Sequence, residues 1–279
     1  MDNEINYQII EDGYNSSYIT SLVTSLFYKS SSADDILNIE PVDPKFTYAQ
    51  ELIKGRFVEP MRRGFSVHSD VINEFRNYII KCNWKSDVKT ILNNHDVKDF
   101  FKYFMDKIYG NNNIVFLRIS DDENIGEVSM PIIELSVPIG LPKVSLTNLF
   151  KMWLNSNIIM NKYKYRVKEL PQIIPLFIKR DDTSSTKIDI MHKIKLFNVC
   201  DELQDKISWT IHAIICHNNS VGYYSVVKDG NKWINISDKD IPSFGQIDMY
   251  DETDVYKISH DAVLVFYKLV YYKFSTKLN

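Results

Sequence analysis

The chain has 279 residues, 44% of them hydrophobic and 13% aromatic, so it is long and apolar enough to bury a sizeable core. A disordered chain is excluded. The 33 basic and 36 acidic residues give a net charge of -3, which argues against binding nucleic acid or an anionic membrane by bulk charge.

The N-terminus, MDNEINYQIIEDG, is polar and acidic, unlike a secretory signal. No apolar run approaches the roughly 20 residues that span a bilayer. Cys82, Cys200 and Cys216 form no CxxC pair, which speaks against a disulfide framework or a zinc ribbon. We expect a cytoplasmic or nuclear protein with no membrane partner. The many Lys, Asn, Ile and Tyr residues are typical of AT-rich genomes, including those of large DNA viruses, for which a virion protein is a further expectation.

The first predicted helix begins after a short polar turn at Gly13. Its apolar positions recur at the spacing of a helix that is buried on one face; they are Ile19, Leu22, Val23, Leu26 and Phe27. Asn15, Ser16 and Ser17 precede or begin this stripe, and their short side chains suit a helix start. The sequence thus predicts an exposed helix start with serines where a reactive group would lie.

Helical patterns continue to about Gly110, and the clearest covers Val97 to Ile108. After Ile114 the chain is rich in short β-branched and aromatic runs, with a hairpin signal at Asp229-Gly230. One helix, SLTNLFKMWL, interrupts them and is capped by Ser145. We predict one α+β domain over residues 1–279, with a helical lobe to about 110, an antiparallel sheet lobe over about 111–279, and a substrate cleft between them.

Five segments, in order, resemble motifs of the ubiquitin-specific proteases, which have a papain-like fold. YNSSYITSLVTSLF resembles the cysteine box GNTCYxNSxLQxL, and HDVKDFFKYFMDKI resembles QDAxEFLxxLLD. LPQIIPLFIKRD resembles LPxxLxxxLKRF. WTIHAIICHNNSVGYYSVVKDGNKWINISDKDI resembles the histidine box, and DAVLVFYK resembles the closing AYxLFY strand. The resemblance implies a ubiquitin carboxyl-terminal hydrolase fold.

By this resemblance, Ser17 occupies the position of the nucleophilic cysteine and Tyr223 that of the general base histidine. Ser237 stands where the family has the residue that orients the histidine, and Asp12 where it has the oxyanion asparagine. A serine hydroxyl needs a base, a phenol with a pKa near 10 is a poor one, and a carboxylate opposes an oxyanion. The resemblance therefore implies that catalysis is lost at all four positions.

Two other residues are alternatives for a displaced site. Cys216 lies in an alternating strand and is better explained as a core thiol. His217 matches a family histidine that is not the base, so we favour a structural role. The sequence has no second His, Cys or carboxylate at metal-ligand spacing on the strand face of His212, which is therefore interpreted as a strand histidine. We therefore expect no metal and no cofactor, and the short region Asn111 to Pro131 implies fingers without zinc.

The resemblance gives Asp96, Asp99 and Tyr224 as contacts of a ubiquitin tail, although helix-start capping explains the two aspartates equally well. Asp181 replaces the aromatic of LKRF and weakens tail binding. In the basic run from Lys151 to Lys168, basic residues from Lys162 onward alternate with Tyr163 and Tyr165, which favours a half-exposed strand over a nucleic-acid site.

The function predicted from the sequence is non-catalytic, that of a pseudoenzyme that serves as a binding or scaffold module. The partner expected from the resemblance is ubiquitin, a ubiquitin-like protein or other subunits of a scaffold, such as a virus particle. Two alternatives stay open: a ubiquitin binder without cleavage, and a hydrolase with an altered nucleophile.

Overall fold

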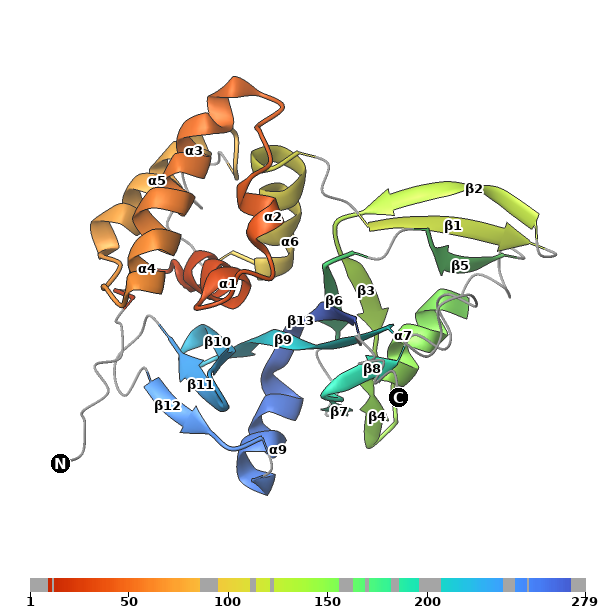
Figure 1. Ribbon diagram of the computed structural model, residues 1–279. Helices are drawn as coiled ribbons and strands as arrows, with labels where there is room; N and C mark the ends of the chain where they lie inside the picture. The colour runs from red at the N-terminus through yellow and green to blue at the C-terminus, as the bar shows by residue number, and fades with distance from the viewer. Residues whose placement is uncertain are drawn as a thin grey trace, which may run out of the picture. The chain divides into compact units, whose positions relative to one another are not determined.

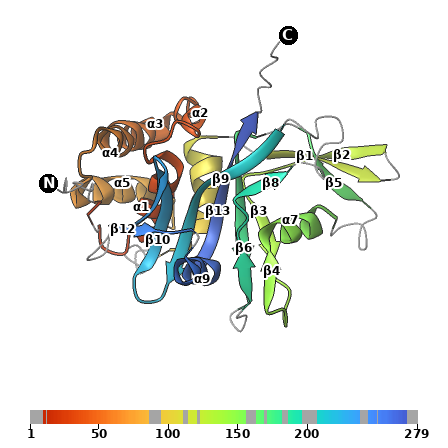
Figure 2. The ribbon, with the colours of Figure 1, turned by 60° about the horizontal axis from the view of Figure 1, so that its bottom comes forward.

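The computed structural model describes residues 10–11, 13–85, 95–110, 114–120, 123–155, 163–168, 171–181, 186–195, 207–237, 244–249 and 251–271. The chain forms two compact units (Figures 1 and 2). Unit 1 comprises Met1–Asn112 and Ala213–Leu264, and unit 2 comprises Asn113–His212 and Val265–Asn279. The grouping does not follow chain order, because residues 213–264 join the helical N-terminal part.

The helical part of unit 1 consists of short helical segments, several of which follow one another without a break. They are α1 (Ser17–Phe27), α2 (Asp34–Leu37), the 3-10 turn η1 (Pro44–Phe46), α3 (Thr47–Glu51), the π-helical η2 (Leu52–Val58), α4 (Glu59–Arg63), α5 (Ser69–Lys81), α6 (Val97–Tyr103) and the π-helical η3 (Phe104–Ile108). Gly110 follows η3 with φ of 52°, a left-handed conformation that ends a helix. The stop that the sequence predicts at this glycine is confirmed.

Unit 1 also contains an antiparallel sheet and one helix. Its strands are the last part of β9 (Ile207–Asn218), β10 (Gly222–Asp229), β11 (Lys232–Ile236) and β12 (Phe244–Ile247), followed by α9 (Glu252–Asp261) and the start of β13 (Ala262–Tyr271). Asp229 pairs with Lys232, and Gly230 has φ of 60°. The hairpin predicted at Asp229-Gly230 is therefore confirmed.

Helix α1 is buried along its whole length, between the other helices and β10 (Figure 1). Its apolar residues enter an aromatic core in which the Tyr18 and Phe100 rings meet edge to face at 5.1 Å. Its hydroxyl-bearing face meets β10, where Ser25 Oγ donates to Ser225 Oγ at 3.1 Å. At the far end, Lys29 and Asp229 form an ion pair of 2.8 Å. The first helix is thus held on both sides.

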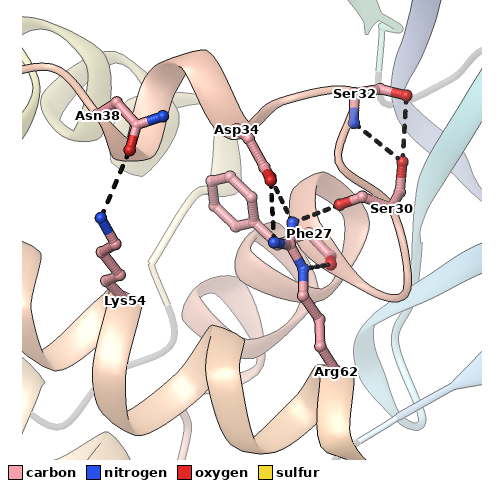
Figure 3. Close-up of polar contacts among 7 residues, drawn as sticks. All are labelled: Phe27, Ser30, Ser32, Asp34, Asn38, Lys54 and Arg62. Carbon is pink, nitrogen blue, oxygen red and sulfur yellow. Dashed lines mark hydrogen bonds and ion pairs between the residues drawn. The ribbon is translucent and has the colours of Figure 1, made fainter.

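Arg62 of α4 fixes the loop that leaves α1 (Figure 3). Its Nε donates to the Phe27 carbonyl at 3.2 Å, and its Nη1 donates to Asp34 Oδ2 at 3.0 Å. Nη2 donates to the Ser30 carbonyl and to Asp34 Oδ1. The planar guanidinium therefore binds the carboxylate with two nitrogens while it satisfies one carbonyl at the end of α1 and one in the loop after it.

Unit 2 has the strands β1 (Ile114–Ser120), β2 (Glu123–Met130), β3 (Ile133–Ser136), β4 (Lys143–Ser145), β5 (Lys164–Val167), β6 (Ile173–Lys179), β7 (Lys187–Asp189) and β8 (Lys193–Lys195), the first half of β9, and most of β13. Strands β2, β1 and β5 form an antiparallel sheet. Helix α7 (Leu146–Asn155) lies beside β3 and β4 (Figure 2). The Trp153 ring of α7 stacks on the Tyr165 ring of β5, with centroids 4.8 Å apart, and so joins the helix to this sheet.

Two features of unit 2 agree with the sequence and one differs. Ser145 Oγ accepts from the Asn148 amide at 3.2 Å, so the predicted cap of α7 is confirmed. The strand predicted in the basic run is β5. The expectation of an antiparallel sheet lobe is only partly right, because β3 pairs with β6 and β4 with β7 in parallel. Partners far apart in sequence gave no local turn signal for this pairing.

Candidate functional site

The turn before α1 is held in an unusual conformation. Tyr14 and Asn15 have φ of 63° and 52°, in the left-handed region that side chains with a Cβ rarely adopt. Arg76 of α5 is 3% exposed, and its Nη1 donates to the Tyr14 carbonyl. A Cβ at Gly13 would lie 2.7 Å from Ile72 Cγ2, so only glycine fits there. Contacts with α5 therefore impose this turn.

Ser16, which precedes α1, and Ser17, which begins it, are both buried and not free to react with a large substrate. Ser16 Oγ accepts from the Gly13 amide at 3.0 Å and makes no capping bond to the helix. Ser17 is 1% exposed, although the sequence predicted an exposed helix start. That expectation of exposure is wrong because β10 packs against α1. Asp12, the predicted oxyanion position, lies outside the described residues.

Tyr223 of β10 joins the starts of two helices. Its backbone amide donates to Ser17 Oγ at 3.3 Å. Its phenol oxygen accepts from the Val97 amide, the first residue of α6, at 3.4 Å. The ring lies against the His217 ring, with centroids 4.6 Å apart. Burial, assisted by the charge of Asp96, raises the pKa of Tyr223 to about 12, so the phenol is protonated at neutral pH.

Asp96 caps the helix that Tyr223 reaches. Its Oδ1 accepts from the Lys98 amide at 2.7 Å and from the Asp99 amide at 3.3 Å. With Tyr223 at Val97, the first three amides of α6 all have acceptors. Asp99 forms an ion pair with Lys85 at 3.2 Å. The capping interpretation thus describes Asp96 in this structure, and contact of either aspartate with a tail stays a prediction.

Ser237 directly follows β11 and is half-buried. It lines one small pocket with Tyr223 and with hydroxyl-bearing residues of α1. The hydroxyl-bearing residues are Thr20, Ser21 and Thr24, and Ile10 and Ile236 complete the lining. The pocket has no room for a water molecule. Tyr223 thus contacts Ser17 and shares with Ser237 a small pocket between α1 and the β10–β11 strands.

Strand β9 carries the histidine and cysteine considered for a displaced site. His217 pairs with Tyr223 across the two strands. Burial lowers the pKa of His217, while Asp261 and Asp96 act in the opposite direction, so the imidazole is neutral near pH 7. Cys216 is fully buried, which fits a core thiol. The described residues contain no group of three or more His, Cys, Asp or Glu that could hold a metal ion.

Tyr224, a predicted tail contact, points into the protein. It is buried, and its hydroxyl donates to Asp261 Oδ2 at 2.8 Å. Burial is the largest of the effects that raise its pKa. Lys257 Nζ lies 5.5 Å from the centroid of the Tyr224 ring. Contact with a tail stays a prediction for this residue, whose hydroxyl is already bonded.

Sequence reasoning missed two charged residues of the site. Arg76 supports the turn before Ser17, and Asp261 binds Tyr224. A signal for Arg76 was present, because it lies one turn after Ile72 on the apolar face of α5 that also holds Phe75 and Ile79. A charged residue on such a face requires an internal partner. Asp261 gave no such signal, since it ends a mostly polar helix.

The sequence model described as ubiquitin carboxyl-terminal hydrolase matches residues 11–267. The chain belongs to this family. A comparison with curated protein sequences finds no match. In the part of the chain that the structure describes, no helix is both long and apolar enough to cross a lipid bilayer.

Several solved structures share the fold. The SAGA DUB module Ubp8/Sgf11/Sus1/Sgf73 bound to monoubiquitin has a TM-score of 0.64 at 13% identity, covering 98% of this chain and 71% of that chain. A structure described as the SAGA Ubp8/Sgf11/Sus1/Sgf73 DUB module has a TM-score of 0.60 at 14% identity, covering 98% of this chain and 70% of that chain. The same module bound to ubiquitin aldehyde has a TM-score of 0.59 at 13% identity, covering 98% of this chain and 71% of that chain. The predicted relation to the ubiquitin-specific proteases and the α+β fold are confirmed.

Proposed function

We propose that this chain is a non-hydrolysing member of the ubiquitin carboxyl-terminal hydrolase family that acts as a protein-binding or scaffold module. One observation carries the proposal. Ser17, at the nucleophile position, is 1% exposed, and its Oγ accepts a hydrogen bond from the Tyr223 amide. An attacking oxygen needs both access to a carbonyl and a base that takes its proton.

The chemistry at the base position supports the same proposal. The Tyr223 phenol, with a pKa of about 12, cannot accept a proton from a serine hydroxyl at neutral pH. Its oxygen is directed to the start of α6, where it accepts from Val97. Ser237 lines a pocket with Tyr223, but position 223 carries no histidine that Ser237 could orient as a base.

Ubiquitin or a ubiquitin-like protein is the partner that we propose first. Similar structures are described as bound to monoubiquitin and to ubiquitin aldehyde, in a module with Sgf11, Sus1 and Sgf73. Two kinds of partner follow for this chain: a ubiquitin-type protein, and other subunits that use the domain as a scaffold. A cytoplasmic, nuclear or virion assembly would suit the second kind.

The test measures hydrolysis and binding on the same protein. We expect no release of the fluorophore from a ubiquitin C-terminal reporter, and measurable heat when ubiquitin is titrated into the protein. Turnover that Ser17→Ala abolishes would overturn the inactive assignment in favour of a hydrolase with a serine nucleophile. Absence of both turnover and ubiquitin binding would leave the scaffold role and exclude ubiquitin as its partner.

A further inference from the structure

The Tyr223 side chain lies between two helix starts and is 9% exposed. We infer that Tyr223 is an internal plug that closes the way to position 17, so that a partner is recognised by its folded surface, with no chain terminus inserted here. The part concerning the partner rests on the proposed function. The closure itself is a property of this chain and is testable without any partner.

Contacts from three elements hold the plug in place. Its backbone is tied to α1 through Ser17, and its hydroxyl to α6 through Val97. Its ring rests on His217 of β9. A side chain fixed at its backbone, ring and hydroxyl has little freedom to swing aside, in contrast to an exposed loop residue.

Among the described residues, the space between Tyr223, Ser237 and α1 is also too small for an entering peptide. An extended chain needs about the 4.8 Å that separates neighbouring strands, in addition to its own side chains. The pocket that Tyr223 shares with Ser237 has no room for even one water molecule. A peptide that reached Ser17 would have to displace the ring, expose its apolar surface to water and remove the acceptor that the phenol offers to Val97.

The experiment uses a thiol at position 17 as a reporter of access. Ser17→Cys is combined with Tyr223→Ala, which removes the plug, and with Tyr223→Phe, which keeps the ring. Each protein is treated with iodoacetamide, and alkylation is followed peptide by peptide by mass spectrometry. Half-buried Cys82, whose pKa is raised chiefly by burial, is the internal reference.

The expected thiolate fractions make the comparison of position 17 with Cys82 stringent. An accessible thiol at a helix start has a lowered pKa, and one pKa unit raises its thiolate fraction about tenfold, so it should react faster than Cys82. We expect the opposite for Ser17→Cys and for its combination with Tyr223→Phe, in which the thiol should react at least about tenfold more slowly than Cys82. With Tyr223→Ala the order should reverse.

Two outcomes overturn the plug. One is alkylation of Ser17→Cys faster than Cys82 while Tyr223 is present. The other is continued protection in the Tyr223→Ala protein when circular dichroism shows that it is folded. If Tyr223→Ala does not fold, the rate in Ser17→Cys alone still decides whether the site is closed.

A binding experiment tests the consequence for the partner. The unaltered protein is titrated with ubiquitin and with ubiquitin that lacks its C-terminal tail. We expect dissociation constants that agree within about twofold, a difference of about 0.4 kcal/mol. Tighter binding of the intact form by tenfold or more would overturn recognition without the tail. Binding of neither form would remove ubiquitin as the partner, and the alkylation series would then decide the plug by itself.

Discussion

The starts of α1 and α6 both meet Tyr223, and they are stabilised in different ways. Helix α6 begins with a local device, since Asp96 caps two amides of its own helix. Helix α1 begins with two residues in the left-handed region and with a serine that makes no capping bond to the helix. Its support comes from Gly13 against Ile72 and from Arg76 of α5.

The difference shows that the start of α1, unlike that of α6, costs folding free energy. A left-handed residue other than glycine costs roughly 1–2 kcal/mol, and a helix start without a side-chain cap loses roughly another 1 kcal/mol. The chain keeps this geometry next to Ser17, the position that the sequence resemblance assigns to the family's nucleophile. The start of α6 has a geometry that serves only the stability of the fold. We interpret the α1 turn as a feature of the family that this chain stabilises through distant contacts.

The largest effect is expected from Arg76→Ala. The change removes a buried guanidinium that donates to the Tyr14 carbonyl and to Asn73 Oδ1 at 2.7 Å. Because hydrogen bonds from charged groups are strong and a cavity remains, we expect a loss of about 3 kcal/mol in the free energy of unfolding. Urea denaturation measures this loss. A loss below about 1 kcal/mol would show that the α1 turn does not depend on α5.

A smaller loss is expected from Asp96→Ala, because it leaves the Lys98 and Asp99 amides without their cap. The expected cost is about 1 kcal/mol, and Asp96→Asn, which keeps an acceptor oxygen, should cost much less. Thermal unfolding of the three proteins checks this order. Equal losses in both variants would mean that the charge of Asp96, and not its cap, supports α6.

Tyr14→Gly should change stability in the opposite direction. Tyr14 is 63% exposed, so little packing is lost, and glycine adopts its φ of 63° without strain. The relief of roughly 1–2 kcal/mol exceeds the entropic cost of glycine, and we expect a gain of about 0.5–1 kcal/mol. Tyr14→Ala is the matched control, since it removes the ring and keeps the strain. If both variants gain equally, the strain is not the cause.

The smallest effect concerns pH, through the imidazole that supports Tyr223. Burial lowers the pKa of His217 in the folded protein below its ordinary value of 6.5. The unfolded chain then binds more protons than the folded one, so stability falls as the pH drops below about 6.5 and is unaffected by this group above it. Urea unfolding on both sides of pH 6.5 should show a weaker pH dependence in His217→Gln. An unchanged dependence would assign it to other groups.

Local patterns in the sequence determined most of the elements around the site. The apolar stripe of α1, the stop at Gly110, the cap at Ser145 and the Asp229-Gly230 hairpin each depend on residues within one or two turns of chain. The motif order also predicted that positions 17, 223 and 237 meet, and in the structure Tyr223 contacts Ser17 and lines one pocket with Ser237. Such information survives in the sequence because the interactions are local or shared by the family.

Tertiary structure alone decided the state of that site. The sequence indicates a serine at a helix start, but its burial depends on β10, which is about 200 residues away. The direction of the Tyr223 side chain and the internal partner of Arg76 likewise depend on contacts with no sequence period. Packing of distant elements sets these features, since a side chain takes the rotamer that its neighbours leave open, and a local pattern does not encode those neighbours.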